Sequence, residues 1–328
     1  MFLFDKIDVS EEEIKTYSAA LLKELLMDRT TRKNILWATD NYIEQGEAYA
    51  PDCEIRPELI TGDHAMLIQP RVSKSDETQD SRTKDKAEVF TPSWVCNEQN
   101  SLVDEQWFGR KNVFNTITEK GWSVNEDKIE FPEGRQKAWG KYVDAKRLEV
   151  SCGEAPYLVS RYDTVTGQEI PLRQRVGLLD RKLRVVNENT ETREDWLKWA
   201  IRAFQAVYGF EYQGDNLLLA RENLLVTFIE YYSDRFQENA PKGLLLKIAR
   251  IISWNLWQMD GLKFVVPNSC KPLITEDVSL FGTEIREEPC PGCASGNIHK
   301  HTGIYSRIYD WRDKSSLAFV TMMKGARS

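Results

Sequence analysis

The first regular pattern of apolar positions begins just after Ser10. Ser10 and Glu13 have the spacing of a capping box, and apolar residues then recur at helical intervals at Ile14, Tyr17, Leu21 and Leu25. This pattern predicts an amphipathic helix to about residue 27, within an N-terminal helical region that we assign to residues 1–70. Residues 71–87 carry many charges and almost no large apolar side chain, which predicts an exposed loop or linker.

From residue 147 onward, short apolar runs alternate with helical periodicity, which is typical of a parallel sheet with crossover helices. Strands are expected at 147–151, 207–212 and 255–260, and each ends in polar residues. A long helix is expected over 215–236, followed by a second apolar helical stretch, LLLKIARII. Thr192 is expected to cap the helix before the second strand, and another helix is expected from Pro156 onward. The pattern therefore predicts an α/β fold.

A basic stretch interrupts the alternation between the first two strands. Residues 164–186 hold five basic side chains, at Arg173, Arg175, Arg181, Lys182 and Arg184. We expect an inserted loop or hairpin there. Its charges are the best candidate for phosphate contact, although a solvated hairpin is the commoner explanation of a single charge run.

Composition narrows the function classes. With 41% hydrophobic and 29% charged residues, the chain has the composition of a folded globular protein. Its net charge of −7 argues against a free-standing DNA-binding protein, because phosphate contact requires clustered cations. No apolar run approaches the roughly 20 residues of a membrane span, and the N-terminus lacks a secretory signal, so we expect no membrane contact and a cytoplasmic location.

The ends of the predicted strands carry the chemistry of a nucleotide-type ligand site, because ligands of open α/β sheets bind beyond the carboxyl ends of the strands. The segment LEVSCGEAPYL at 148–158 resembles the first motif of amino-methyltransferases that use S-adenosylmethionine (SAM). In this resemblance Glu149 takes the position of an aspartate and Cys152-Gly153 match directly. Ala155 replaces a second glycine.

Three further segments extend the resemblance. Glu211, after the second strand, stands where such enzymes place an acid on the ribose hydroxyls, and Asp260 after the third stands where they hold the adenine amino group. Upstream, Phe90, Thr91 and Pro92 resemble a Phe-Thr-Pro segment that closes over the methionine end. Singly, each piece is ordinary loop chemistry. In this order they resemble the N6-adenine DNA methyltransferases of restriction-modification systems over roughly residues 86–265.

The resemblance implies a Rossmann-like SAM-dependent methyltransferase core over 88–265, with an N-terminal helical extension and a Cys/His-containing C-terminal segment at 266–328. One family feature is missing: a polar residue, two prolines and an aromatic hold the flipped adenine, but none of the 12 prolines here is adjacent to another. The sequence stops about where that motif is expected, and no catalytic residue is assigned. We expect either a half-enzyme that reaches DNA in a complex with a second polypeptide, or a non-catalytic interaction or regulatory protein of a restriction-modification or phage-defence system.

A second candidate site lies in the C-terminal segment. Cys290 and Cys293 have the spacing of a zinc knuckle, and His299 and His301 follow closely. Zinc favours four sulfur and nitrogen ligands in a tetrahedron, so these four residues are candidate ligands of a structural zinc ion. The alternative is a polar turn with two free thiols. Pro289-Cys290 also resembles the nucleophile of cytosine-C5 methylation, but its place inside a Cys-Pro-Gly-Cys turn favours a knuckle.

Overall fold

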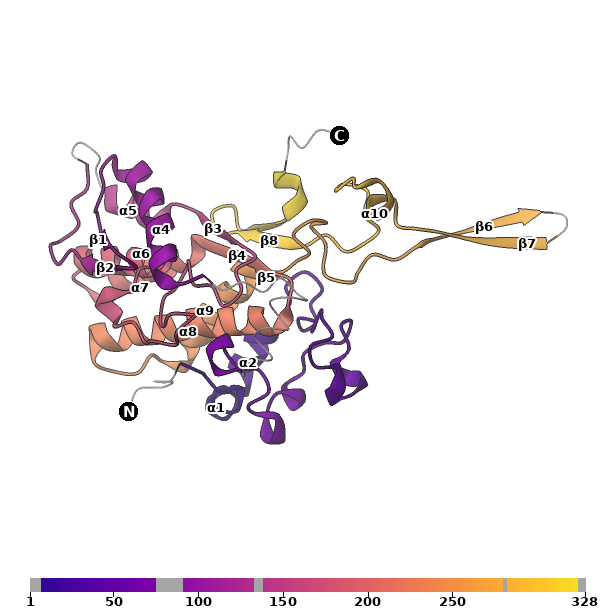
Figure 1. Cartoon of the computed structure of the whole chain (residues 1–328), viewed down its shortest axis with the longest axis horizontal. Coiled ribbons are helices and arrows are strands. Elements are labelled where there is room, and N and C mark those ends of the chain that lie inside the picture. Colours follow the sequence, from indigo (N-terminus) through magenta and orange to yellow (C-terminus); the bar gives the residue numbers. More distant parts are fainter. Residues whose placement is uncertain (1–6, 75–90, 133–137, 280–281, 324–328) are drawn as a thin grey trace.

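A three-stranded parallel sheet forms the centre of the computed structural model, which describes residues 7–74, 91–132, 138–279 and 282–323. Its strands lie in the order β3 (Arg147–Val150), β4 (Val207–Glu211) and β5 (Leu256–Gln258). The register pairs Leu148 with Tyr208 and Phe210 with Trp257. The three predicted strands and the α/β class are confirmed (Figure 1).

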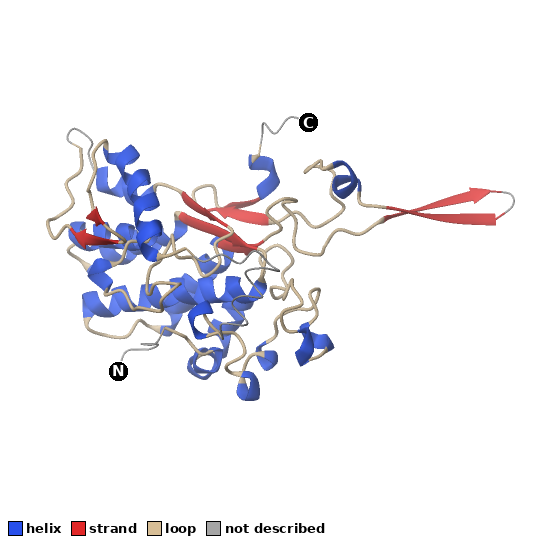
Figure 2. Ribbon diagram, in the orientation of Figure 1, coloured by secondary structure: helices blue, strands red, loops and turns tan. Residues whose placement is uncertain are grey.

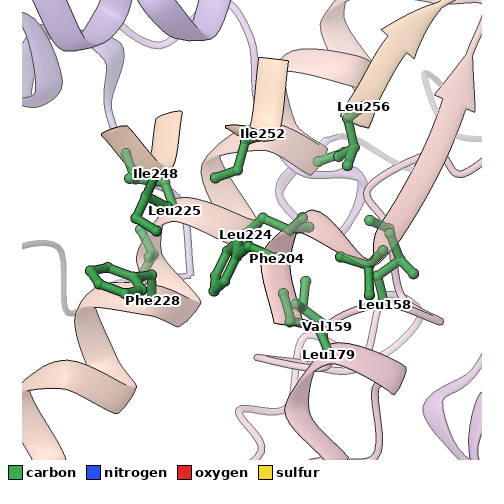
Figure 3. Packing of buried hydrophobic residues seen from close by; sticks show 14 of the residues in the cluster. Leu158, Val159, Leu179, Phe204, Leu224, Leu225, Phe228, Ile248, Ile252 and Leu256 are labelled. Carbon is green, nitrogen blue, oxygen red and sulfur yellow. The ribbon is translucent and has the colours of Figure 1, made fainter. Parts of the chain in front are cut away.

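Helices connect the strands as the alternating pattern predicts. The segment from β3 to β4 contains α6 (Leu178–Asn189) and α7 (Arg193–Gln205), and the segment from β4 to β5 contains α8 (Gly214–Phe236) and α9 (Lys242–Asn255). The Thr192 hydroxyl accepts the N–H of Asp195 at 3.2 Å, so the predicted cap is confirmed. Figure 3 shows the core between these elements, where Phe204 of α7, Leu224 of α8 and Ile252 of α9 pack together.

The N-terminal region packs onto this core. The single predicted helix is two helices, α1 (Glu11–Tyr17) and α2 (Ala19–Leu26), because Ser18 adopts an extended conformation between them. The Ser10 side chain makes no capping hydrogen bond, so the expected capping box does not form. Short 3-10 turns follow at Ile43–Gln45, Glu47–Tyr49, Pro57–Leu59, Gly62–His64 and Arg71–Ser73.

Tight backbone contacts join that region to the sheet. The backbone N–H and carbonyl of Leu36 both bond to the side-chain amide of Gln258 in β5, at 2.8 Å each. A Cβ atom at Gly214 would lie 1.9 Å from the Leu36 carbonyl oxygen, so α8 begins at a residue that must be glycine. Of the predicted linker, residues 75–87 lie outside the described part of the chain.

The stretch after β3 differs from expectation. No helix follows Pro156: the chain runs through turns and a short 3-10 turn (Leu172–Gln174) until α6 begins at Leu178. The predicted basic loop or hairpin over 164–186 is therefore wrong in its second half, which is helical. The physical reason is that Arg181 and Lys182 are buried on α6, beside α4 (Ser93–Phe108) and α5 (Ala138–Asp144).

Small antiparallel sheets complete the fold (Figure 2). Strands β1 (Asn115–Thr118) and β2 (Gly121–Val124) pair near α4. Strands β6 (Leu273–Ser279) and β7 (Gly282–Glu288) form a hairpin that projects far from the body in Figure 1. A short helix, α10 (Pro291–Ser295), follows, then β8 (Arg307–Asp310), β9 (Ser315–Ala318) and a 3-10 turn (Phe319–Met322).

The two faces of the central sheet are covered unequally. On one face, Ile308 and Phe319 pack over Tyr208 and Phe210 of β4 and Trp257 of β5. On the same face of the edge strand β3, Leu148 and Val150 remain 44% and 63% exposed. No helix in the described ranges combines the length and apolarity needed to cross a bilayer.

Candidate functional site

The carboxyl ends of the three parallel strands meet at one edge of the sheet, and Glu211 links two of them. This buried carboxylate ends β4 and accepts the N–H of Gly153 at 2.9 Å, from the loop that follows β3. Its other oxygen accepts the N–H groups of Tyr212 at 2.8 Å and Gln213 at 3.1 Å. Glu211 therefore fixes the turn into α8 and the Cys-Gly loop together.

Glu149 organises the same loop from within β3. Its two oxygens accept the backbone N–H groups of Tyr157 at 3.3 Å and Leu158 at 3.1 Å. Burial raises the pKa of Glu149 to about 8, and the nearby Glu211 carboxylate adds to the effect. Burial also raises the pKa of Glu211, against the three N–H groups that it accepts. The site thus holds two buried acids whose oxygens accept backbone N–H groups and fix the loop after β3 and the turn into α8.

The Cys152-Gly153 turn is tightly packed. The Cys152 thiol is buried and lies against Gly209, where a Cβ atom would approach the sulfur to 3.2 Å. Burial raises the pKa of this thiol well above its usual value, so it stays protonated and unreactive. Gly153 and Ala155 both adopt left-handed conformations, with φ of 52° and 63°, so Ala155 takes a backbone shape that glycine adopts at lower cost.

Asp260 lies in a turn just beyond β5. Its Oδ1 accepts the N–H groups of Leu262 at 3.0 Å and Lys263 at 3.1 Å, and its Oδ2 lies 3.4 Å from the Lys263 ammonium. The side chain is 16% exposed, so part of its acceptor capacity faces solvent. Glu149 lies one residue before the end of β3, Glu211 ends β4 and Asp260 lies two residues beyond β5, so all three are near the carboxyl edge of one sheet.

The Phe-Thr-Pro segment lies partly within the described chain. Phe90 lies outside it. The Thr91 carbonyl accepts the Thr164 hydroxyl at 3.1 Å, and the Thr91 side chain lies near Tyr157 of the loop after β3, where burial raises the pKa of Tyr157 and Thr91 partly offsets that rise. Pro92 lines a cavity of about 440 Å³ together with Trp122 and Asp163. The structure therefore brings Thr91 and the loop after Cys152-Gly153 together.

The basic run from 173 to 184 is largely occupied by contacts within the chain. Arg181 pairs with Asp104 at 2.5 Å, Arg175 with Glu230 at 2.6 Å and Arg184 with Glu188 at 2.8 Å. Lys182 donates to the carbonyls of Ala145 and Ala206. Arg173 remains exposed and, with Arg175, Arg184 and Arg235, lines a cavity of about 520 Å³.

A compact group of metal-ligand side chains lies at the base of the projecting hairpin. It consists of Cys270, Cys290, Cys293 and His301, whose ligand atoms all lie within 4.8 Å of one another. The three sulfurs lie 3.6, 3.7 and 3.7 Å from Nδ1 of His301. This group can hold a metal ion. Three of the four predicted ligands are present, but His299 is exposed and outside the group, and Cys270 takes its place.

Hydrogen bonds to the Cys290 sulfur favour its thiolate form, which is the form that binds a metal cation. Burial opposes ionisation of Cys290, but the N–H of Thr302 at 3.2 Å and the neighbouring His301 overcome it and lower the pKa of Cys290 to about 5. Burial raises the pKa of Cys270 to about 11. The His301 backbone N–H donates to the Tyr305 hydroxyl at 3.0 Å, which fixes the backbone that carries the imidazole.

Sequence reasoning missed Cys270 because the whole hairpin separates it from Cys290. The available signal was its position: Cys270 stands just before β6 (Leu273–Ser279), and Cys290 stands just after β7 (Gly282–Glu288). His299 is close to the cysteines in sequence, but its side chain is exposed and lies outside the group. Its backbone N–H donates to the side-chain oxygen of Asn297 at 2.9 Å.

Comparison with family models, with curated proteins and with solved structures gave no match for this chain.

Proposed function

We propose that the carboxyl edge of the β3–β5 sheet binds S-adenosylmethionine and that the chain is the cofactor-binding part of a DNA adenine-N6 methyltransferase. The observation that carries the proposal is the bond from Gly153 to Glu211. It joins the glycine turn that follows β3 to the acid that ends β4, at the carboxyl edge of the sheet, which is the edge where open α/β sheets bind their ligands.

Each acid has a distinct role in this proposal. A carboxylate offers about four lone-pair sites, and Glu211 uses three on backbone N–H groups, so one remains for a ribose hydroxyl. Asp260 is 16% exposed, and its Oδ2, which lies beside the Lys263 ammonium, has the acceptor capacity to bind the adenine amino group as well. Glu149 accepts backbone N–H groups of the loop with both oxygens and anchors that loop.

The exposed edge of β3 supports the proposal that a second polypeptide segment completes the enzyme. Parallel sheets are normally buried on both faces, yet Leu148 and Val150 present aliphatic surface beside a strand edge that pairs with no other strand in the described part of the chain. This edge adjoins the Cys-Gly loop. The segment that we propose here is a strand leading into a polar-Pro-Pro-aromatic motif, which would stack on the flipped adenine and accept its amino hydrogens near the cofactor.

Calorimetric titration with SAM tests cofactor binding. The wild type is expected to bind one equivalent, and Glu211→Gln and Asp260→Asn are expected to bind at least about tenfold more weakly, because each loses a charge-assisted hydrogen bond of about 1.5–3 kcal/mol. Glu58→Gln, which changes a carboxylate that is 62% exposed, is the matched control and should bind as the wild type does. Absence of binding by the wild type would refute the proposal.

The competing function is a non-catalytic interaction or regulatory protein built on the same fold. The absence of adjacent prolines in the sequence favours it over a self-sufficient enzyme. An assay of methyl transfer from SAM to adenine-containing DNA separates the possibilities. The half-enzyme proposal expects SAM binding without methylation by the chain alone, and methylation by the chain alone contradicts it.

We further propose that the ion held by Cys270, Cys290, Cys293 and His301 is zinc in a structural role. Tetrahedral zinc with bonds of about 2.3 Å to sulfur and 2.0–2.1 Å to nitrogen places sulfur and nitrogen roughly 3.6 Å apart. The observed separations of 3.6 to 3.7 Å agree with that geometry. Four protein ligands leave no open position for catalysis. Metal analysis of protein purified without chelators should give one zinc per chain, and a lack of stoichiometric metal would refute the proposal.

A further inference from the structure

The two legs of the projecting hairpin meet at the metal group. Cys270 lies just before β6 and Cys290 lies just after β7, so an ion bound by both closes the whole hairpin into a loop. Cys293 on α10 and His301 beyond it supply the remaining ligands. The ion would therefore join both legs of the hairpin to the chain that follows it.

The apolar side chains that are described in the hairpin give it little support from the body. Leu273 and Ile274 of β6 are 40% and 68% exposed, and Ile285 of β7 is 66% exposed, so these apolar side chains do not pack against the body. Ile285 pairs with Glu276, which lies two residues after Ile274 in β6. Paired residues share a face, as do residues two apart in one strand, so Ile274 and Ile285 lie on the same face of the hairpin. An isolated two-stranded hairpin is marginally stable at best in water, so this one needs a fixed base.

Hydrogen bonds around Thr302 join the chain segments at the base of the hairpin. The Thr302 hydroxyl donates to the Lys271 carbonyl at 2.6 Å and accepts the Lys271 N–H at 3.1 Å, while its N–H donates to the Cys290 sulfur. Farther inward, the Val266 N–H bonds to the Ile304 carbonyl at 2.8 Å. These contacts tie the two segments that carry Cys270 and His301 to each other.

The backbone packs closely against His301 and Cys270 at the base of the hairpin. A Cβ atom at Gly292 would lie 2.5 Å from Nδ1 and 2.6 Å from Cγ of the imidazole. A Cβ atom at Gly303 would lie 3.0 Å from the Cys270 sulfur. The two glycines let the backbone approach the ligands closely enough for four donor atoms from three separate segments to meet.

From this arrangement we propose that the metal centre is a clamp that holds the β6–β7 hairpin as an ordered arm, an inference that rests on the proposal that zinc occupies the site. The clamp links the two ends of the hairpin. Linking the ends of a loop reduces the number of conformations that the unpaired chain can adopt, which favours the paired strands. The arm keeps its pairing only while both Cys270 and Cys290 are bound to the ion.

Amide hydrogen exchange of the full chain tests the clamp. In the zinc-loaded protein, peptides covering 272–279 and 282–289 should exchange slowly. After zinc is removed with a chelator they should exchange about tenfold faster or more, and zinc addition should restore the slow rate. Peptides from α8 should not change, because that helix is buried in the core.

Two variants make the result specific. Cys270→Ser should exchange as the zinc-free wild type does in the hairpin, whereas Cys53→Ser, which changes a cysteine outside the metal group, should match the zinc-loaded wild type. If zinc is present at one per chain but its removal leaves hairpin exchange unchanged, the clamp is refuted and the zinc proposal stands. If metal analysis finds no zinc in the wild type, both are refuted.

Discussion

Removing the carboxylate of Asp104 should destabilise the protein severely, because it leaves a charged guanidinium in the core. Asp104 pairs with Arg181 at 2.5 Å, and both side chains are at most 2% exposed. The carboxylate also accepts the Tyr142 hydroxyl at 2.9 Å. Breaking a buried ion pair by removing one partner costs about 3–5 kcal/mol, against a total stability of about 5–15 kcal/mol for a typical domain.

Urea unfolding followed by tryptophan fluorescence measures this cost for Asp104→Ala. The matched control is Arg173→Ala, which removes an exposed cation from the same basic run and should change the free energy of unfolding by less than about 0.5 kcal/mol. The double variant Asp104→Leu with Arg181→Leu should recover much of the loss, because apolar replacement of a whole buried pair is often neutral. A cost below about 1 kcal/mol for Asp104→Ala would refute the buried pairing and would indicate that Arg181 is exposed to solvent.

Three further predictions follow from single contacts. Burial raises the pKa of Glu149 from its usual 4.5 to about 8 in the folded protein. Between these two pH values the folded protein holds the proton and the unfolded chain does not, so the free energy of unfolding should fall as pH rises. Urea titrations at pH 5 to 9 measure this slope, and Glu149→Gln should flatten it. Gly292→Ala should lower zinc content by displacing His301, whereas Gly243→Ala, with nothing within 4 Å, should not. Gly214→Ala should cost at least about 1–3 kcal/mol in thermal or urea unfolding, since its Cβ would overlap the Leu36 carbonyl.

Local patterns in the sequence predicted the elements whose evidence is local. The apolar periodicity of α8 and the Thr192 cap depend on residues within a few positions of each other, and both are confirmed. The basic run was misjudged because the partner of Arg181 lies 77 positions away, where no local pattern records it. On α6, Leu179, Leu183 and Val186 did carry the helical spacing, but the neighbouring charges obscured it.

The same limit explains the candidate sites. The sequence could place the strand-end acids near one edge because parallel strands bring their carboxyl ends together, a rule that needs only the order of the elements. Their role in binding a cofactor stays a prediction. The fourth metal ligand was missed because a hairpin carries the chain away and returns it between Cys270 and Cys290. Metal ligands that a hairpin brings together from its two ends can be predicted only once the pairing of the two strands is known.

Hydrogen exchange with and without SAM is the most direct test of the claim that the sheet edge is a cofactor site. We predict that saturating SAM slows exchange in three separated stretches, at 149–158, 211–215 and 258–263, and that Glu211→Gln loses this protection at the same SAM concentration. Protection confined to another region, such as the arginine-lined cavity near Arg173, or no protection at all, would contradict the account.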